Sequence, residues 1–336
     1  MYKYDGTDTE WISYKENPFE STFQQGLAYL SYNENETKAE FKGVLNNDKT
    51  YEFVLPYENE NGLHLIANPF PFNMDWDNLQ KENVAIGYAV INAEGGYEYL
   101  TSGVIKTGDG FFVKSFSNNA ILTYDEEQQS DNNISRSINI IASGNAGKDN
   151  LIICMSDEGY EGFPKLNNKN ESIANIYINN NDKHYGIYNC SEDVKEINVD
   201  FKANEQGTYT FHIDRVGEFK MIALVDNFTG ENTDMLLNDY TFNATAQDNH
   251  NRFVIRFSNG EGMAENNNSK FAYQSGDGLV IDAEGCVQII DMMGRLVYSD
   301  NVIGDNNRID MNKFNSATYI IRLINADGVR VQKIIL

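Results

Sequence analysis

The sequence lacks the features of helical, membrane-spanning and nucleic-acid-binding proteins. Only 5 Pro and 26 Gly occur among its 336 residues, which excludes collagen-like and proline-rich chains. No apolar run approaches the roughly 18 residues that a membrane-spanning helix needs. With 26 basic against 50 acidic residues, the net charge of −24 would repel a phosphate backbone. We therefore expect no membrane span and no nucleic-acid partner.

Motifs of catalysis and metal binding are also missing. There is no G-x-S-x-G elbow, H-E-x-x-H pair or phosphate-binding loop. The four histidines share no metal-ligand spacing: His64, His184, His212 and His250. We predict a chain that is not an enzyme and has no catalytic residues and no metal ligands. Calcium remains an alternative cofactor, since loop carboxylates such as Asp149 and Asp226 suit a hard cation.

Cysteine is scarce and does not settle the compartment. The number is odd and no C-x-x-C pair occurs: Cys154, Cys190 and Cys286. Cys154 lies in an apolar run, where a free thiol behaves as a small buried hydrophobe. A disulfide between Cys154 and Cys190 is the alternative.

The sequence does contain many short segments that alternate apolar and polar residues. Examples are residues 40–44, 51–55, 97–100, 207–213 and 252–257. A period of two, rich in aromatic and β-branched residues, is typical of half-buried antiparallel strands. The best helical candidate is one or two turns at residues 75–81. The predicted fold is all-β, with tandem antiparallel β-sandwich modules of jelly-roll or Ig-like type.

Two polar gaps, at residues 125–133 and 258–269, lack aromatic and β-branched residues and are expected to be linkers. They divide the chain into predicted modules at 1–128, 134–258 and 270–336, the last being a small Ig-like domain. The N-terminus enters β-like sequence at once and has no signal-peptide core. We therefore expect the chain to be the C-terminal part of a longer protein.

The last predicted module carries a recognisable series of motifs. A strand ends in a turn with Asp291, Gly294 and Arg295, a later segment contains Tyr319, and the final strand contains Lys333. This pattern resembles the C-terminal sorting domain of type IX (Por) secretion substrates. One position departs from the family, because Ala317 stands where glycine is usual. Alanine resists positive φ and could tighten the turn.

The resemblance implies a small β-sandwich and export across the outer membrane of a Gram-negative bacterium. It also implies that the type IX machinery is a partner, and that the sorting motif consists of Asp291, Gly294, Arg295, Tyr319 and Lys333. The protein would then be secreted or held at the cell surface.

The first predicted module is similar to a region that often precedes such sorting domains. Asn68 opens an Asn-Pro-Phe-Pro segment, and Asp75 and Trp76 follow it. These residues have two interpretations: an aromatic ligand platform, or a fixed loop with a buried Trp76. Tyr97, Tyr99 and Tyr160 could likewise stack on sugar rings, although alternating tyrosines are more typical of cross-strand packing.

Two functional hypotheses follow. The first is a non-catalytic secreted or cell-surface protein, in which spacer or adhesion modules precede the sorting domain. The second is the carbohydrate-binding accessory region of a secreted glycan-active enzyme. The partner beyond the secretion machinery would be a host or dietary glycan, or a surface protein.

Overall fold

The computed structural model describes residues 1–6, 10–16, 18, 22–31, 42–57, 62–127, 134–156, 162–246, 248–258, 271–275, 278–304, 307–310, 314–315, 317–325 and 328–335. Nearly all regular structure in these residues is β-strand, which confirms the predicted fold class. The predicted linkers at 125–133 and 258–269 lie mostly outside the described residues. The predicted module boundaries therefore stay a prediction.

The chain forms two compact units. Unit 1 comprises residues 1–194, 199–217 and 241–250, and unit 2 comprises residues 195–198, 218–240 and 251–336. The strands up to residue 125 are β1 (Tyr2–Asp5), β2 (Glu10–Ser13), β3 (Tyr29–Leu30), β4 (Thr50–Leu55), β5 (Leu63–Ala67), β6 (Met74–Asp75), β7 (Gln80–Glu82), β8 (Tyr88–Ile91), β9 (Tyr97–Leu100), β10 (Val104–Ile105), β11 (Gly110–Lys114) and β12 (Ala120–Asp125).

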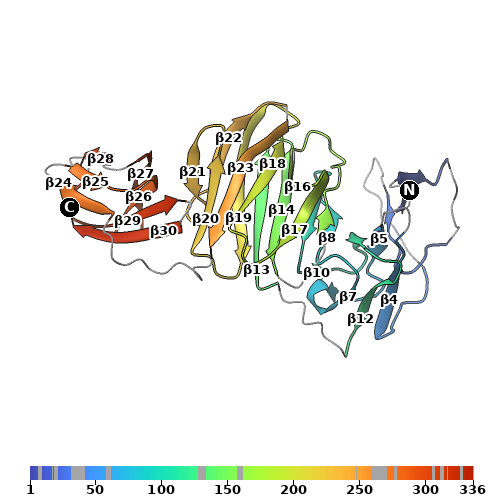
Figure 1. Ribbon diagram of the computed structural model, residues 1–336. Coiled ribbons are helices and arrows are strands. Elements are labelled where there is room, and N and C mark those ends of the chain that lie inside the picture. The colour runs from blue at the N-terminus through green and yellow to red at the C-terminus, as the bar shows by residue number, and fades with distance from the viewer. Residues whose placement is uncertain are drawn as a thin grey trace. The chain divides into compact units, whose positions relative to one another are not determined.

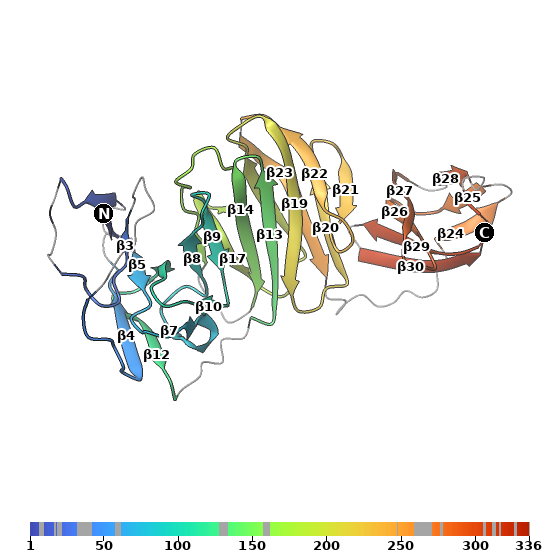
Figure 2. The ribbon, with the colours of Figure 1, turned by 180° about the vertical axis from the view of Figure 1, so that it is seen from behind.

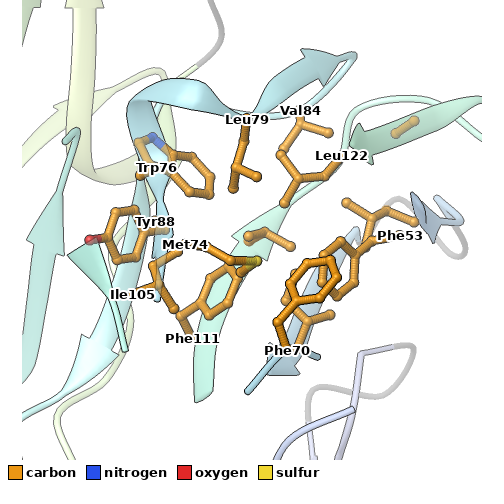
Figure 3. Close-up of a cluster of buried hydrophobic side chains, with 14 residues drawn as sticks. Phe53, Phe70, Met74, Trp76, Leu79, Val84, Tyr88, Ile105, Phe111 and Leu122 are labelled. Carbon is orange, nitrogen blue, oxygen red and sulfur yellow. The ribbon is translucent and has the colours of Figure 1, made fainter. Parts of the chain in front are cut away.

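Two small sheets of unit 1 enclose an aromatic core. Their strand orders are β5-β11-β8-β9 and β4-β12-β7. Figure 3 shows that Trp76, Tyr88 and Phe111 lie close together in this core, with Met74 and Ile105 beside them. The alternation predicted for residues 51–55 and 97–100 appears as β4 and β9, whose inward side chains are buried.

The helical candidate at residues 75–81 appears as a single 3-10 turn (η1, Trp76–Asn78), after which the chain extends again into β7. One local prediction needs correction. The strand predicted at residues 40–44 is absent from its described residues 42–44, and Val44 is fully exposed there. An alternating pattern stabilises a strand only where a partner strand and an apolar surface receive it.

The middle of the chain forms longer strands. They are β13 (Arg136–Gly144), β14 (Gly147–Met155), β15 (Phe163–Pro164), β16 (Asn175–Asn180), β17 (Lys183–Cys190), β18 (Glu196–Lys202), β19 (Gly207–Val216), β20 (Met221–Asp226), β21 (Glu231–Asp234), β22 (Tyr240–Ala244) and β23 (Asp248–Ser258). In unit 1 the order β16-β17-β14-β13-β19 forms a broad sheet, whose strands lie side by side in Figures 1 and 2. All pairs are antiparallel except β14 with β17.

The cysteines in this region are buried free thiols, so the alternative disulfide is not formed. The register explains why. Met155 is the partner of Cys190 on the neighbouring parallel strand, and Cys154 is the partner of Asn189. Since partners share a face of the sheet and successive residues alternate, the thiols of Cys154 and Cys190 point to opposite faces.

The C-terminal strands of unit 2 form a small sandwich. They are β24 (Ala272–Ser275), β25 (Gly278–Ile281), β26 (Gly285–Asp291), β27 (Leu296–Val302), β28 (Asn307–Asp310), β29 (Thr318–Asn325) and β30 (Gly328–Ile335), drawn in orange and red in Figure 1. One sheet has the order β24-β25-β28 and the other β27-β26-β29-β30. Leu279 and Ile281 of the first sheet pack against Val287, Ile289 and Ile321 of the second.

Candidate functional site

A tight turn between β26 and β27 is the centre of the candidate site. The Asp291 carboxylate accepts hydrogen bonds from the backbone N–H groups of Met293 (2.9 Å) and Arg295 (3.0 Å). The Arg295 guanidinium donates to the same carboxylate at 2.8 Å. Gly294 has φ +81°, a conformation that side chains resist. These hydrogen bonds connect the three motif residues Asp291, Gly294 and Arg295 within one turn. This hydrogen-bonded turn is called the latch below.

The charge state of the turn follows from these contacts. The hydrogen bond from the Arg295 backbone N–H is the largest factor that lowers the pKa of Asp291, and the guanidinium adds to it. Asp291 is thus a carboxylate at neutral pH. Between Asp291 and Gly294, the Met292 and Met293 side chains are 66% and 79% exposed, so the latch presents two apolar groups to solvent.

The register of the four-stranded sheet brings the other motif residues to the same end. Asp291 on β26 lies opposite Tyr319 on β29, and Tyr319 lies opposite Ile334 on β30. Lys333 is the partner of Ile320, one position further along. Motif residues that are 42 positions apart in the sequence (291 and 333) therefore lie on neighbouring rungs of one sheet.

Tyr319 and Lys333 have different environments. The Tyr319 ring is buried against Phe314, at 5.8 Å between ring centroids, and its hydroxyl donates to the Asn315 carbonyl at 3.0 Å. Lys333 is exposed on the edge strand. Tyr319 thus belongs to the core of the sandwich, and Lys333 belongs to its surface.

The sequence reasoning missed Gln332, which connects the two sheets. Its side-chain oxygen accepts from the backbone N–H groups of Phe271 (3.0 Å) and Ala272 (3.1 Å), and its amide donates to the Ala272 carbonyl. The Arg330 guanidinium lies 5.0 Å from the Phe271 ring centroid. The alternating pattern of β30 could have revealed Gln332, because it places this polar residue opposite the buried Ile321.

The predicted loop residues of the first module are fixed inside unit 1. Asn68 is buried and donates to the carbonyls of Phe72 (2.8 Å) and Ile105 (3.1 Å), and it accepts from Phe70 N–H (2.9 Å). Asp75 caps η1 by accepting from Asp77 N–H at 3.1 Å. This segment, residues 68–81, is called the corner below.

Trp76 is the buried anchor of the corner. Its side chain is fully buried, and its indole N–H donates to the Ile86 carbonyl at 3.0 Å. The Lys81 ammonium lies 4.6 Å from the Trp76 ring centroid and donates to the carbonyls of Trp76 and Leu79. Burial lowers the Lys81 pKa to about 7. Trp76 has no exposed face that a ligand could use.

The other candidates considered from the sequence are engaged within the protein. Tyr97 and Tyr99 are buried, so the alternative of exposed sugar-stacking rings is wrong for both, and Tyr160 lies outside the described residues. Asp149 and Asp226 were predicted to lie in loops, but they lie in β14 and β20, and their carboxyl groups contact the basic side chains of Lys165 and Arg252. Across the part of the chain that the structure describes, no group of three or more metal-ligating side chains occurs.

Comparison with known proteins identifies the C-terminal module. Residues 275–336 match the family of the secretion system C-terminal sorting domain, and this range contains all five sorting-motif residues. The match confirms the resemblance and indicates export across the outer membrane, to the cell surface or the medium. No curated protein and no solved structure matches the chain. None of the helices in the described ranges is long and apolar enough to cross a membrane.

Proposed function

Because the chain carries a type IX sorting tail, we propose that it is a non-catalytic secreted or cell-surface protein. In this proposal, the β-sandwich strands before residue 270 act as spacer or adhesion modules, and residues 275–336 direct export. The match of the tail to the sorting family is the observation that carries the proposal. The latched turn at Asp291, with two exposed methionines, is the feature that we assign to recognition by the secretion machinery.

Buried charge in the preceding strands supports a structural role for them. In unit 2, Asp226 is completely buried and accepts from the Arg252 guanidinium (2.8 Å) and from the Tyr240 hydroxyl (2.8 Å). It also accepts from Phe228 N–H at 2.9 Å, which fixes the turn between β20 and β21. A buried carboxylate with these partners stays ionised and is engaged in holding the turn. The pKa of Asp226 is lowered by these hydrogen bonds, although burial alone would raise it.

An export assay tests the proposal on the full chain. The chain would be expressed with an inner-membrane export signal in a bacterium that has the type IX machinery. We expect the intact chain at the surface or in the medium, and a chain lacking residues 275–336 in the periplasm. Equal amounts of both chains outside the cell would rule the proposal out.

Two glycines provide a matched test of the turn. A Cβ at Gly294 or at Gly304 would meet no atom within 4 Å, and both residues have positive φ (+81° and +68°). Each glycine-to-alanine change should therefore cost the same folding free energy, about 1 kcal/mol. We expect Gly294→Ala to lower export several-fold and Gly304→Ala to leave it unchanged. If both variants lower export equally, stability rather than the turn is the cause.

The carbohydrate-binding alternative is supported by one surface feature of unit 1. Phe72 is 39% exposed and stacks on Phe70, with 4.7 Å between ring centroids, and Tyr124 lies 5.9 Å from Phe72. Partly exposed aromatic rings of this kind can pack on the apolar face of a sugar. A glycan array with the full chain tests this function. Reproducible binding that Phe72→Ala abolishes would favour it, and an absence of binding would leave the spacer or adhesion function.

A further inference from the structure

A lysine side chain that is largely buried and an aspartate side chain that is completely buried lie in direct contact in unit 1. The Lys165 Nζ atom lies 2.7 Å from Asp149 Oδ1 and 2.5 Å from Asp149 Oδ2. The exposed fractions of the two side chains are 6% and 0%. Both oxygens of one carboxyl group therefore face one amine in a site with little access to water. This pair has no part in the function proposed above.

The backbone holds both residues in place. Asp149 belongs to β14, where it is the partner of Ala142 on β13. Lys165 follows β15, and its backbone N–H donates to the His184 carbonyl on β17 at 2.8 Å. Because the backbone of each residue is bonded to a neighbouring strand, the sheet holds the amine and the carboxyl group close together. Such fixed proximity raises the effective concentration of one group at the other by orders of magnitude.

The surroundings place aromatic rings beside the amine and hydrogen-bond donors beside the carboxyl group. The Tyr99 ring centroid lies 4.6 Å from Lys165 Nζ, and Phe163 packs edge-on against Tyr99. Asp149 Oδ2 accepts from the Ile176 backbone N–H at 2.8 Å. Two donors, this N–H and that of Asn150, thus face the carboxyl group. Fixed N–H donors of this kind stabilise the negative oxygen of a tetrahedral intermediate.

We propose that Lys165 and Asp149 condense to an intramolecular amide, which cross-links β14 covalently to the segment after β15. Lys165 Nζ attacks Asp149 Cγ, and the charge that develops on Oδ2 is held by the Ile176 N–H. The C–Oδ1 bond then breaks, and Oδ1, which already carries the proton of the neutral acid, leaves as water with a second proton from Nζ. One C–N bond forms and one C–O bond breaks, so the step needs no oxidant, reductant or cofactor.

The environment favours the reacting protonation states. Burial is the largest factor acting on each group: it raises the pKa of Asp149 and lowers the pKa of Lys165. Both shifts favour the neutral acid and the neutral amine, which are the forms that condense. The product also fits the site, because its remaining N–H points at the Asn150 carbonyl, which lies 3.3 Å from Nζ, and its carbonyl keeps the Ile176 donor.

The mass of the purified full chain tests the proposal. Under denaturing conditions, we expect most molecules to be lighter than the sequence mass by one water molecule. Trypsin should fail to cleave after Lys165, and fragmentation should identify a branched peptide that contains Asp149. A chain with the full sequence mass, or a mass deficit located at other residues, would overturn the proposal.

Three variants serve as controls in the same measurement. Lys165→Arg keeps the positive charge but cannot condense, so the full mass should return. Asp149→Asn should lose ammonia instead of water, because an amide nitrogen is then the leaving group. Lys81→Arg changes another partly buried lysine of unit 1 and should leave the deficit of one water unchanged. A water deficit that persists in Lys165→Arg would also contradict the cross-link.

Discussion

The corner of unit 1 and the sorting turn of unit 2 are both held by hydrogen bonds between a side chain and nearby backbone. They differ in how deeply they are buried. In both, a short side chain with an oxygen acceptor binds the backbone of its own loop: Asn68 in the corner and Asp291 in the turn. The corner is closed by a fully buried Trp76. The turn is instead closed by an exposed Arg295 and presents Met292 and Met293 to solvent.

This difference in burial indicates that the corner contributes to the stability of the fold and the turn contributes to recognition. A loop whose polar atoms and rings are buried contributes free energy of folding, because removing a group leaves a cavity or an orphaned polar atom. A loop held by exposed hydrogen bonds contributes little folding free energy, but it fixes the shape of a surface. We therefore expect changes in the corner to affect unfolding, and changes in the turn to affect export.

The largest effect is expected for Trp76→Ala. The change removes a fully buried indole and leaves the Ile86 carbonyl without its donor, so unfolding free energy should fall by about 3–5 kcal/mol. Urea denaturation followed by tyrosine and tryptophan fluorescence measures this loss. Phe228→Ala, which removes a ring that is 83% exposed, should cost less than about 0.5 kcal/mol. Equal losses would show that the corner is not an anchor.

A smaller loss is expected for Asn68→Ala. The variant removes three hydrogen bonds in a buried site, which should cost about 2 kcal/mol. Asn73→Ala is the matched control, since exposed Asn73 accepts a single bond from Thr107 N–H at 3.2 Å. If the control loses as much stability in urea as Asn68→Ala, the corner does not depend on the buried amide.

The corner should also make stability depend on pH near neutrality. Burial lowers the folded pKa of Lys81 to about 7, against an ordinary 10.5, so between these values the unfolded chain binds more protons. Unfolding free energy should therefore rise with pH from 7 to 9, by roughly 1 kcal/mol per unit. Lys81→Met should flatten the profile. A wild-type curve that is already flat would contradict the buried amine.

The sequence predicted many of the strands and the sorting motif, but it did not predict the side-chain contacts that these residues make. The alternation at residues 97–100 identified β9, yet it did not show that Tyr99 is buried among Asn150, Lys165 and Phe163, because those partners come from distant segments. Gln332 was missed for the same reason. Its role depends on a second sheet that a local pattern does not encode.

The turn itself was more accessible to prediction than the corner. Asp291, Gly294 and Arg295 are within five residues of one another, so their hydrogen bonds follow from local turn chemistry. The two interpretations of Trp76 could not be separated from the sequence, because burial is set by β8 and β11 around it. The strand predicted at 40–44 failed at residues 42–44 because no described neighbour covers Val44.

The smallest effect is expected in the turn, when acid protonates Asp291. Its folded pKa is lowered below the ordinary 3.8, so the latch contributes stability above that value and loses it as pH falls through the folded pKa. NMR titration of the Met293 and Arg295 amide protons should give a common midpoint below 3.8. Since the Arg295 backbone N–H is the largest cause, Arg295→Ala should move that midpoint only part of the way back. A return to the ordinary value in Arg295→Ala would show that the guanidinium, and not the backbone, holds the turn.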